Sequence, residues 1–165
     1  QLLWGSMIFA GILNLPENTK GCDLIRIQPD DTWETIVGKD GLSGMDSGFN
    51  NPRNAYLWWM EEHDNWLYAG TWDDSIVVAA GLGVLLLQTN VNMPLSEDIP
   101  LLTTALRCGA DLFKSPDGVH WYPVFDDGLR NPDNYGIRTM KSAKGSLYLG
   151  FANPSDGLEI WKSTP

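Results

Sequence analysis

One short strand-like pattern occurs three times in this chain, and each copy is followed by a second strand-like block. The copies of the first pattern are Ile8–Gly11, Leu67–Gly70 and Leu147–Gly150. The second block begins at Gly21, Gly109 and Gly157. An internal repeat constrains the fold more strongly than any other feature, because each repeat is one structural unit that must stack on its neighbours. The recurrence predicts a modular chain built from similar β units.

The longest matching runs align without gaps, which indicates duplicated units. Residues 48–72 match residues 128–152, and residues 21–37 match residues 109–125. Each unit contains short runs rich in aromatic and β-branched residues, separated by Gly, Asn, Asp and Pro, as expected for β-strands joined by turns. Four short antiparallel strands in each repeat are typical of a β-propeller blade. We therefore expect an all-β propeller segment of about three four-stranded blades, with a β-sandwich as the main alternative.

The expected strands recur in the same order within each blade. First strands are expected at 56–61 and 136–142, second strands at 66–71 and 146–151, third strands at 23–27, 111–115 and 159–163, and fourth strands at 32–37 and 120–125. The blades then run approximately over residues 1–47, 48–127 and 128–165, within a single propeller segment over 1–165. Propellers close with about four to eight blades, so we expect the remaining blades to come from a longer chain or from other copies.

The second blade carries an insertion over residues 75–107 that the other blades lack. It opens with an apolar run, Ile76–Leu87, which is too short to span a bilayer. Asp98 is placed to cap a short helix over Ile99–Arg107. The insertion is therefore expected to be irregular and partly helical. Two interpretations remain open, a small core of its own against the blade or a docking surface for a partner, a neighbouring subunit or a membrane.

The charge of the chain excludes one class of partner. The formal net charge is −10 at pH 7, and the sequence pI is about 4.4. A phosphate backbone would be repelled by this field, so nucleic acid is not an expected partner. The two cysteines, Cys22 and Cys108, form no metal or redox motif, and the sequence leaves open whether they pair.

The turn Ser115-Pro116-Asp117-Gly118-Val119-His120-Trp121 resembles the Asp-box of sialidase-like propellers, S-x-D-G-x-x-W. In such a turn, Asp117 would accept hydrogen bonds from backbone amides, Gly118 would supply a positive φ, and Trp121 would pack into the blade. The resemblance implies a structural role for Ser115, Asp117, Gly118 and Trp121, and also for Asp30 and Trp33 in a degenerate first copy. Outside residues 75–107, most of the chain is similar to bacterial or archaeal surface propellers with N-P-x-N-Y-G and G-x-L-Y-x-G motifs.

Known catalytic motifs are missing from the sequence. It contains no metalloprotease, phosphate-loop, nucleophile-elbow or dinucleotide motif, and its two histidines, His63 and His120, are isolated. None of its arginines matches the carboxylate-clamping arginines that sialidase chemistry requires. We assign no catalytic residue. A fragment of a sialidase-like glycoside hydrolase stays as the alternative, and a converging carboxylate pair would favour it.

Function is instead expected on the face opposite the Asp-box turns, as the resemblance to propellers implies. The loops expected there contain two copies of the motif Asn-Pro-x-Asn, and variable loops on a fixed scaffold commonly carry function. The candidate binding residues are Asn51, Asn54, Trp72, Asn131, Asn134, Tyr135 and Arg138. Their side chains could hydrogen-bond a sugar, stack on it or clamp it. No cofactor is expected, although calcium remains open because Asn and Asp supply oxygen ligands.

These observations predict a non-catalytic binding or scaffold module. It would belong to a secreted or cell-surface β-propeller that presents its loops to a glycan or a protein partner. The expected location is extracellular, periplasmic or on the cell surface. For the Asn-Pro-x-Asn motifs, a role purely as turn formers remains the competing interpretation.

Overall fold

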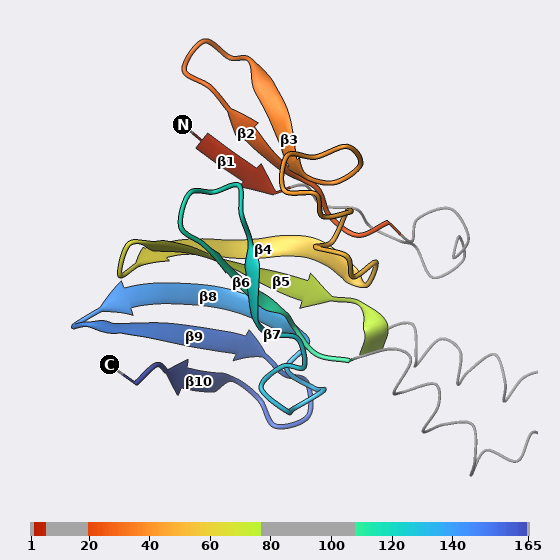
Figure 1. The fold of residues 1–165 in the computed structure, drawn as a ribbon. Helices are drawn as coiled ribbons and strands as arrows, with labels where there is room; N and C mark the ends of the chain where they lie inside the picture. The colour runs from red at the N-terminus through yellow and green to blue at the C-terminus, as the bar shows by residue number, and fades with distance from the viewer. Residues whose placement is uncertain (1, 6–19, 77–107, 165) are drawn as a thin grey trace, which may run out of the picture.

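The computed structural model describes residues 2–5, 20–76 and 108–164 (Figure 1). Every strand within these residues pairs with its neighbours in the antiparallel sense, so the predicted all-β class is confirmed. The helix expected over 99–107, most of the apolar run 76–87 and the strand expected at 8–11 lie outside the described residues. The strands are β1 Leu2–Gly5, β2 Leu24–Ile27, β3 Trp33–Val37, β4 Asn54–His63, β5 Trp66–Asp73, β6 Leu112–Ser115, β7 Tyr122–Phe125, β8 Gly136–Ala143, β9 Ser146–Ala152 and β10 Glu159–Lys162.

The strands form three successive groups, which we call units 1, 2 and 3. Unit 1 is the three-stranded sheet β1–β2–β3. Unit 2 is β4–β5–β6–β7, in which each strand pairs with the next along the chain. Unit 3 is β8–β9–β10, and a single residue pair, Trp72 with Gly136, joins it to unit 2 in one seven-stranded sheet. This sheet is strongly curled into a half-barrel, and β10 lies at its edge (Figure 1).

Strand register shows that the three units repeat the same pairing. Gly70 lies opposite Leu112, and Gly150 lies opposite Ile160. In unit 1 the equivalent pair is Gly5 opposite Leu24. The strand equivalent to 67–70 and 147–150 is therefore Leu2–Gly5, and the assignment of the first copy of the repeat to Ile8–Gly11 is wrong. The sequence match at 8–11 had the right residue types, but pairing with β2 decides the equivalence.

The units also repeat their irregularities. The β2–β3 pair shifts register after Leu24, and the β6–β7 pair shifts after the equivalent Leu112. The β4–β5 and β8–β9 pairs both shift between equivalent positions, at 57–59 and 137–139. Bulges of this kind increase the local twist of a strand pair. Because the bulges lie at equivalent places, the units have the same local twist, and each unit presents the same faces to its neighbours.

Two apolar cores lie between the units, one on each face of unit 2. Neighbouring residues of a strand point to opposite faces, so Phe113 packs with unit 1 while Leu112 packs with unit 3. The core between units 1 and 2 is Leu24, Ile36, Val37, Phe49, Ala69, Phe113 and Trp121. The core between units 2 and 3 is Ala110, Leu112, Ile137, Met140, Leu147, Leu149 and Phe151. Stacking of units, rather than packing within a unit, therefore buries most of the apolar surface.

Trp121 closes the core between units 1 and 2. Its ring meets Phe49 edge-on at 5.5 Å between centroids, and Phe49 stacks on Phe113 at 4.3 Å. Only 5% of Trp121 is exposed, whereas Trp33, which register places at the equivalent position of unit 1, is 65% exposed. The difference follows from the neighbours, because among the described residues no unit covers the face of unit 1 on which Trp33 lies.

The different burial of these two tryptophans predicts that the same substitution destabilises the chain to very different extents. Trp121→Ala should lower the free energy of unfolding by about 3–5 kcal/mol, because it removes a large buried ring and leaves a cavity. Trp33→Ala should change it by less than about 1 kcal/mol, because most of that ring already contacts solvent. Urea denaturation followed by circular dichroism measures both. Equal destabilisation by the two variants would contradict the stacking of units described above.

Candidate functional site

The loops expected to carry function lie together at one end of the strands. At the start of β5, Leu67 pairs with Ser115, so the Asp117 turn lies at that end. At the finish of β5, Asp73 pairs with Asn54, and the backbone N–H of Asp73 donates to the carbonyl of Tyr135 at 2.8 Å. Both Asn-Pro loops and the described ends of the insertion therefore share the end opposite the Asp117 turn, as predicted. We call this end the loop end.

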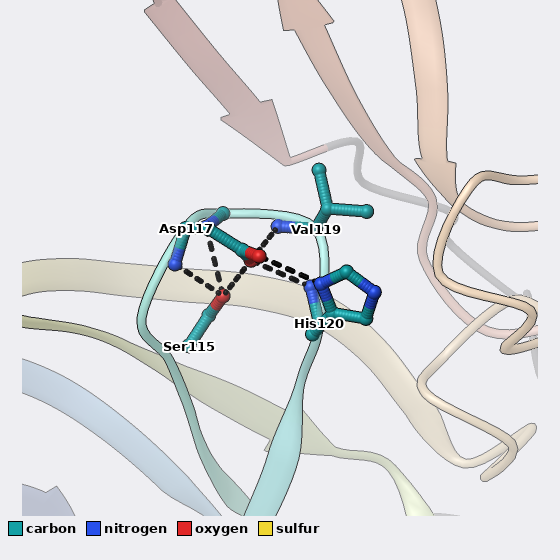
Figure 2. Close-up of polar contacts among 5 residues, drawn as sticks. Ser115, Asp117, Val119 and His120 are labelled. Atoms are coloured by element: carbon teal, nitrogen blue, oxygen red, sulfur yellow. Dashed lines mark hydrogen bonds and ion pairs between the residues drawn. The ribbon is translucent and has the colours of Figure 1, made fainter.

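The Asp117 turn has the hydrogen bonds that its sequence predicts (Figure 2). Asp117 Oδ1 accepts from the backbone N–H groups of Val119 at 2.9 Å and His120 at 2.8 Å. Ser115 Oγ accepts from the N–H of Gly118 at 2.8 Å, and Gly118 has a φ of 76°. The hydrogen bond with the His120 ring, together with those from the backbone N–H groups of His120 and Val119, holds the pKa of the Asp117 carboxyl well below its usual range. Asp117 thus stabilises the turn, which supports a structural role.

The turn over 28–32 differs from the Asp117 turn. Asp30 Oδ1 accepts from the N–H and the hydroxyl of Thr32, at 3.1 and 2.6 Å. The positive φ falls on Asp31, at 64°, where the Asp117 turn uses Gly118. Asp30 therefore also serves its turn, through a smaller set of bonds, and these bonds lower the pKa of its exposed carboxyl.

The Asn-Pro loops form two equivalent corners between units. The N–H of Cys22 donates to the carbonyl of Asn54 at 2.8 Å, and the N–H of Ala110 donates to that of Asn134 at 2.8 Å. Each corner begins with a glycine at positive φ, Gly48 at 69° and Gly128 at 60°. A Cβ on Gly48 would lie 2.1 Å from the carbonyl oxygen of Asn51, so the corner excludes any side chain there.

The asparagine side chains of these corners are used inside the fold. Asn54 Nδ2 donates to the carbonyl of Gly48 at 2.9 Å and to Asp111 Oδ2 at 2.6 Å. Asn134 Nδ2 makes the equivalent bonds to the carbonyl of Gly128 and to Glu159, at 3.0 and 2.9 Å. Both asparagines are fully buried. Their geometry supports a structural role for Asn54 and Asn134, because both N–H groups of each Nδ2 already have a partner inside the fold and neither is left for a ligand.

Asn51 and Asn131 join the same network from the loop surface. Their Nδ2 groups donate to Asp111 at 3.1 Å and to Glu159 at 2.8 Å. Their Oδ1 atoms accept from the N–H groups of Arg53 and Asp133, at 3.0 and 3.1 Å, which closes a local turn. Of the seven candidate binding residues, these four asparagines therefore stabilise the corners.

The other three candidates lie in an aromatic cluster at the loop end. Trp72 and Tyr135 are 6.2 Å apart between ring centroids. Tyr56 stacks on Trp72 at 4.6 Å, and Trp58 lies 6.2 Å from both Trp72 and Tyr135. The guanidinium of Arg138, which is exposed, lies 5.0 Å above the ring of Trp58. We call Tyr56, Trp58, Trp72, Tyr135 and Arg138 the aromatic cluster.

Gly136 allows this cluster to form where units 2 and 3 meet. A Cβ on Gly136 would lie 2.2 Å from the Trp58 ring and 2.9 Å from Trp72. The four aromatic rings are only partly buried, and they come from β4, from β5 and from the residue before β8. Tyr56 and Trp58 are not among the candidate residues predicted from the sequence. The alternation of residues 56 and 58 along one strand could have placed both on one face, because side chains in a strand alternate with period two.

Beside the cluster, the loop end contains buried carboxyl groups. Burial raises the pKa of Asp73 to about 7, from an ordinary value of 3.8, although its Oδ1 accepts from the N–H of Ser75 at 2.8 Å. Burial also raises the pKa of Asp74, and this shift is opposed by Arg53, whose Nη1 lies 3.2 Å from Asp74 Oδ1. Asp73 is therefore largely protonated below neutral pH, which is unusual for a carboxyl group.

The equivalent corner of unit 3 explains what a protonated Asp73 can do. There Asn153 Nδ2 donates to Asn134 Oδ1 at 3.0 Å. In unit 2 the register places Asp73 at the position of Asn153, opposite Asn54. Asn54 Oδ1 is buried and has no hydrogen-bond partner within residues 20–76 and 108–164. A neutral Asp73 carboxyl can donate a proton toward this oxygen, whereas the ionised form cannot.

Metal binding and disulfide formation have no support in the described part of the chain. There, no group of three or more His, Cys, Asp or Glu side chains is arranged to hold a metal ion. Cys22 and Cys108 are both free thiols, and burial raises the pKa of Cys22 to about 12. Within the residues that the structure describes, no helix has the length and apolar character needed to cross a membrane.

Asp73→Asn should convert the corner of unit 2 into that of unit 3. The pKa of Asp73 is higher folded than unfolded, so its favourable contribution is present below pH 3.8 and is lost as the pH rises through about 7. Asp73→Asn should therefore be more stable than the native chain at pH 7 and above, by about 1–3 kcal/mol, because the amide satisfies Asn54 Oδ1 at every pH. The gain should shrink as the pH is lowered.

Denaturation midpoints measured across this pH range test the effect. Asp156→Asn, at an exposed residue of the loop after β9, is the matched control and should show no such pH dependence. A stability difference between Asp73→Asn and the native chain that is the same at low and neutral pH would contradict the assigned role of Asp73.

No protein-family model matches this chain, and comparisons with curated proteins and with solved structures find no match. The resemblance to Asp-box propellers therefore rests on the 115–121 turn and on the internal repeat. What supports a function is the geometry of the loop end, where the aromatic cluster and the buried carboxyl groups meet.

Proposed function

We propose that this chain is a non-catalytic binding module of a secreted or cell-surface β-propeller and that it binds a glycan at the loop end. A protein partner at the same loops is the alternative. The aromatic cluster is the observation that carries the proposal. It combines four partly buried rings with one exposed guanidinium at the junction of two units.

The repeated stacking of units supports the propeller. Unit 2 has four consecutive antiparallel strands, as a blade does, and it buries one face against unit 1 and the other against unit 3. The first strands of units 2 and 3, β4 and β8, lie next to each other, as inner strands around a channel would. The hydrogen bonds of the Asp117 turn add a second independent feature of the Asp-box type.

The chemistry of the aromatic cluster fits a carbohydrate. Trp and Tyr rings offer large apolar faces together with polar edges, and a sugar ring likewise has an apolar face with hydroxyl groups around it. Contacts between the rings and Gly136 hold the cluster in place, so little side-chain entropy would be lost on binding. Arg138 adds several N–H donors that can reach hydroxyl or carboxylate oxygens beside the rings.

The buried carboxyl pair at the loop end does not favour the glycosidase alternative. Asp73 and Asp111 are near each other, since Asn51 Nδ2 lies 3.4 and 3.1 Å from their Oδ2 atoms. Both side chains are buried, and both take part in the corner network. A glycosidase needs two carboxyl groups that flank the bond to be cleaved. A pair inside the corner has no such access to a sugar.

Affinity electrophoresis in gels containing xylan or polygalacturonate tests the proposal with one neutral and one acidic polysaccharide. The native chain should be retarded in at least one gel. Trp72→Ala should reduce this retardation by about tenfold or more in apparent affinity, because stacking on a central aromatic ring dominates such contacts. Trp59→Ala is the matched control, because Trp59 is an exposed tryptophan on the same strand outside the cluster.

The pattern across variants decides the outcome. We expect Trp59→Ala to be retarded as much as the native chain. Trp72→Ala should lose retardation while its circular dichroism spectrum stays that of the native chain. Arg138→Gln should weaken retardation more in the polygalacturonate gel than in the xylan gel if the guanidinium contacts carboxylates. Equal retardation of all variants, or release of reducing sugar by the native chain that Asp73→Asn abolishes, would contradict a non-catalytic site at the aromatic cluster.

A further inference from the structure

A cavity of about 340 Å³ lies between units 2 and 3, on the side away from the aromatic cluster. Its walls are mostly apolar and come from β7, the loop that follows β7, β9 and β10, with further residues from the β4–β5 hairpin, β5 and β6. The residues that line it include Val124, Phe125, Leu129, Leu147, Leu149 and Trp161. Two of them are strongly exposed for apolar side chains in a core position, Val124 at 47% and Trp161 at 44%.

The repeat shows what fills the equivalent place between units 1 and 2. Strand register and the repeat alignment match the six residues named above, in the same order, to Ile36, Val37, Phe49, Leu67, Ala69 and Phe113 between units 1 and 2. All six belong to the core that surrounds Trp121 or pack against it. There Ile36 is fully buried and Phe113 is 4% exposed. The cavity is therefore the place that a tryptophan equivalent to Trp121 would occupy.

The strand that would carry this tryptophan is defined by β10. In units 1 and 2, the strand equivalent to β10 has a further strand beside it, β3 or β7. Among the described residues, β10 pairs with β9 alone and lies at the edge of its sheet (Figure 1). Regular pairing continues to Ser163, whose N–H donates to the carbonyl of Leu147 at 2.8 Å. Ser163 matches Ser115, which begins the turn that leads to Trp121.

We propose that the edge of β10 and this cavity together form a socket for an added β-strand that bears a tryptophan. The backbone of the strand would pair with β10, and its indole ring would enter the cavity, as in peptide recognition by strand addition. The residues after the tryptophan would alternate as in Trp121–Phe125. Residues 6–19 and 77–107 contain no tryptophan, so the strand comes from polypeptide outside residues 1–165.

A synthetic peptide provides the probe. A fluorescein-labelled peptide with the sequence of residues 116–127 contains the tryptophan and the following strand residues, and fluorescence anisotropy measures its binding to the chain. We expect saturable binding. The same peptide with alanine in place of its tryptophan should bind at least about tenfold more weakly, because the aromatic anchor of a pocket dominates binding.

Chain variants locate the site of binding. Val124→Glu places a charge in the cavity at a position that is already half exposed, and it should weaken peptide binding by about tenfold or more. Leu42→Glu is the control, because Leu42 is an exposed aliphatic residue that does not line the cavity. Trp72→Ala should bind the peptide normally, which separates this socket from the proposed glycan site.

Three results would overturn the proposal. The first is equal binding of the tryptophan and alanine peptides, or no saturable binding of either. The second is unchanged binding to Val124→Glu, which would mean that the peptide replaces β7 or binds elsewhere. The third is self-association of the chain that Val124→Glu abolishes but that the peptide does not inhibit. A second copy of the chain, and not an added strand, would then occupy the socket.

Discussion

A buried asparagine, whose side chain and backbone together join two successive units, makes the contact on which the rest of this structure depends. Asn54 Nδ2 donates both to the carbonyl of Gly48 and to Asp111, the residue before β6, while the backbone carbonyl of Asn54 accepts from Cys22, which precedes β2 of unit 1. Hydrogen bonds to charged groups contribute about 1.5–3 kcal/mol each, and leaving a buried carboxylate unpaired costs more. The corner thus selects one angle between neighbouring units, and Asn134 repeats it between units 2 and 3.

The positions of the functional surfaces follow from this angle. It brings Tyr135 beside Trp72 and aligns Gly136 with Trp58, so the aromatic cluster exists only where two units meet. The same angle stacks the apolar faces of the units and creates the core that Trp121 fills. Asp73 shows that the corner also tolerates variation, because a carboxyl with a raised pKa stands there in the place of an amide.

Much of the backbone could be predicted from the sequence, but the roles of single residues could not. Runs of aromatic and β-branched residues place most strands to within two residues, and the Asp117 turn depends on local chemistry that the motif contains. Alternation can place Tyr56 and Trp58 on one face of β4. The bulges at 57–59 and 137–139 change which side chains face which neighbour, so the contacts of these rings with Trp72 and Tyr135 could be assigned only from the register. The sequence indicates surface loop residues at Asn54 and Asn134, because the hydrogen-bond partners that they contact inside the fold are distant in sequence. Trp33 matched Trp121 in sequence, but its burial depends on a neighbouring unit.

Native-state hydrogen exchange of Asn54→Ala, compared with the native chain, tests the central role of the corner most directly. If the corner holds two units together, exchange protection should fall in β2 and β3 of unit 1 as well as in β4, β5 and β6 of unit 2. Protection in β9 and β10 should fall less, because the second corner is intact. A loss of protection confined to residues 48–54, with the strands of both units unchanged, would contradict the account.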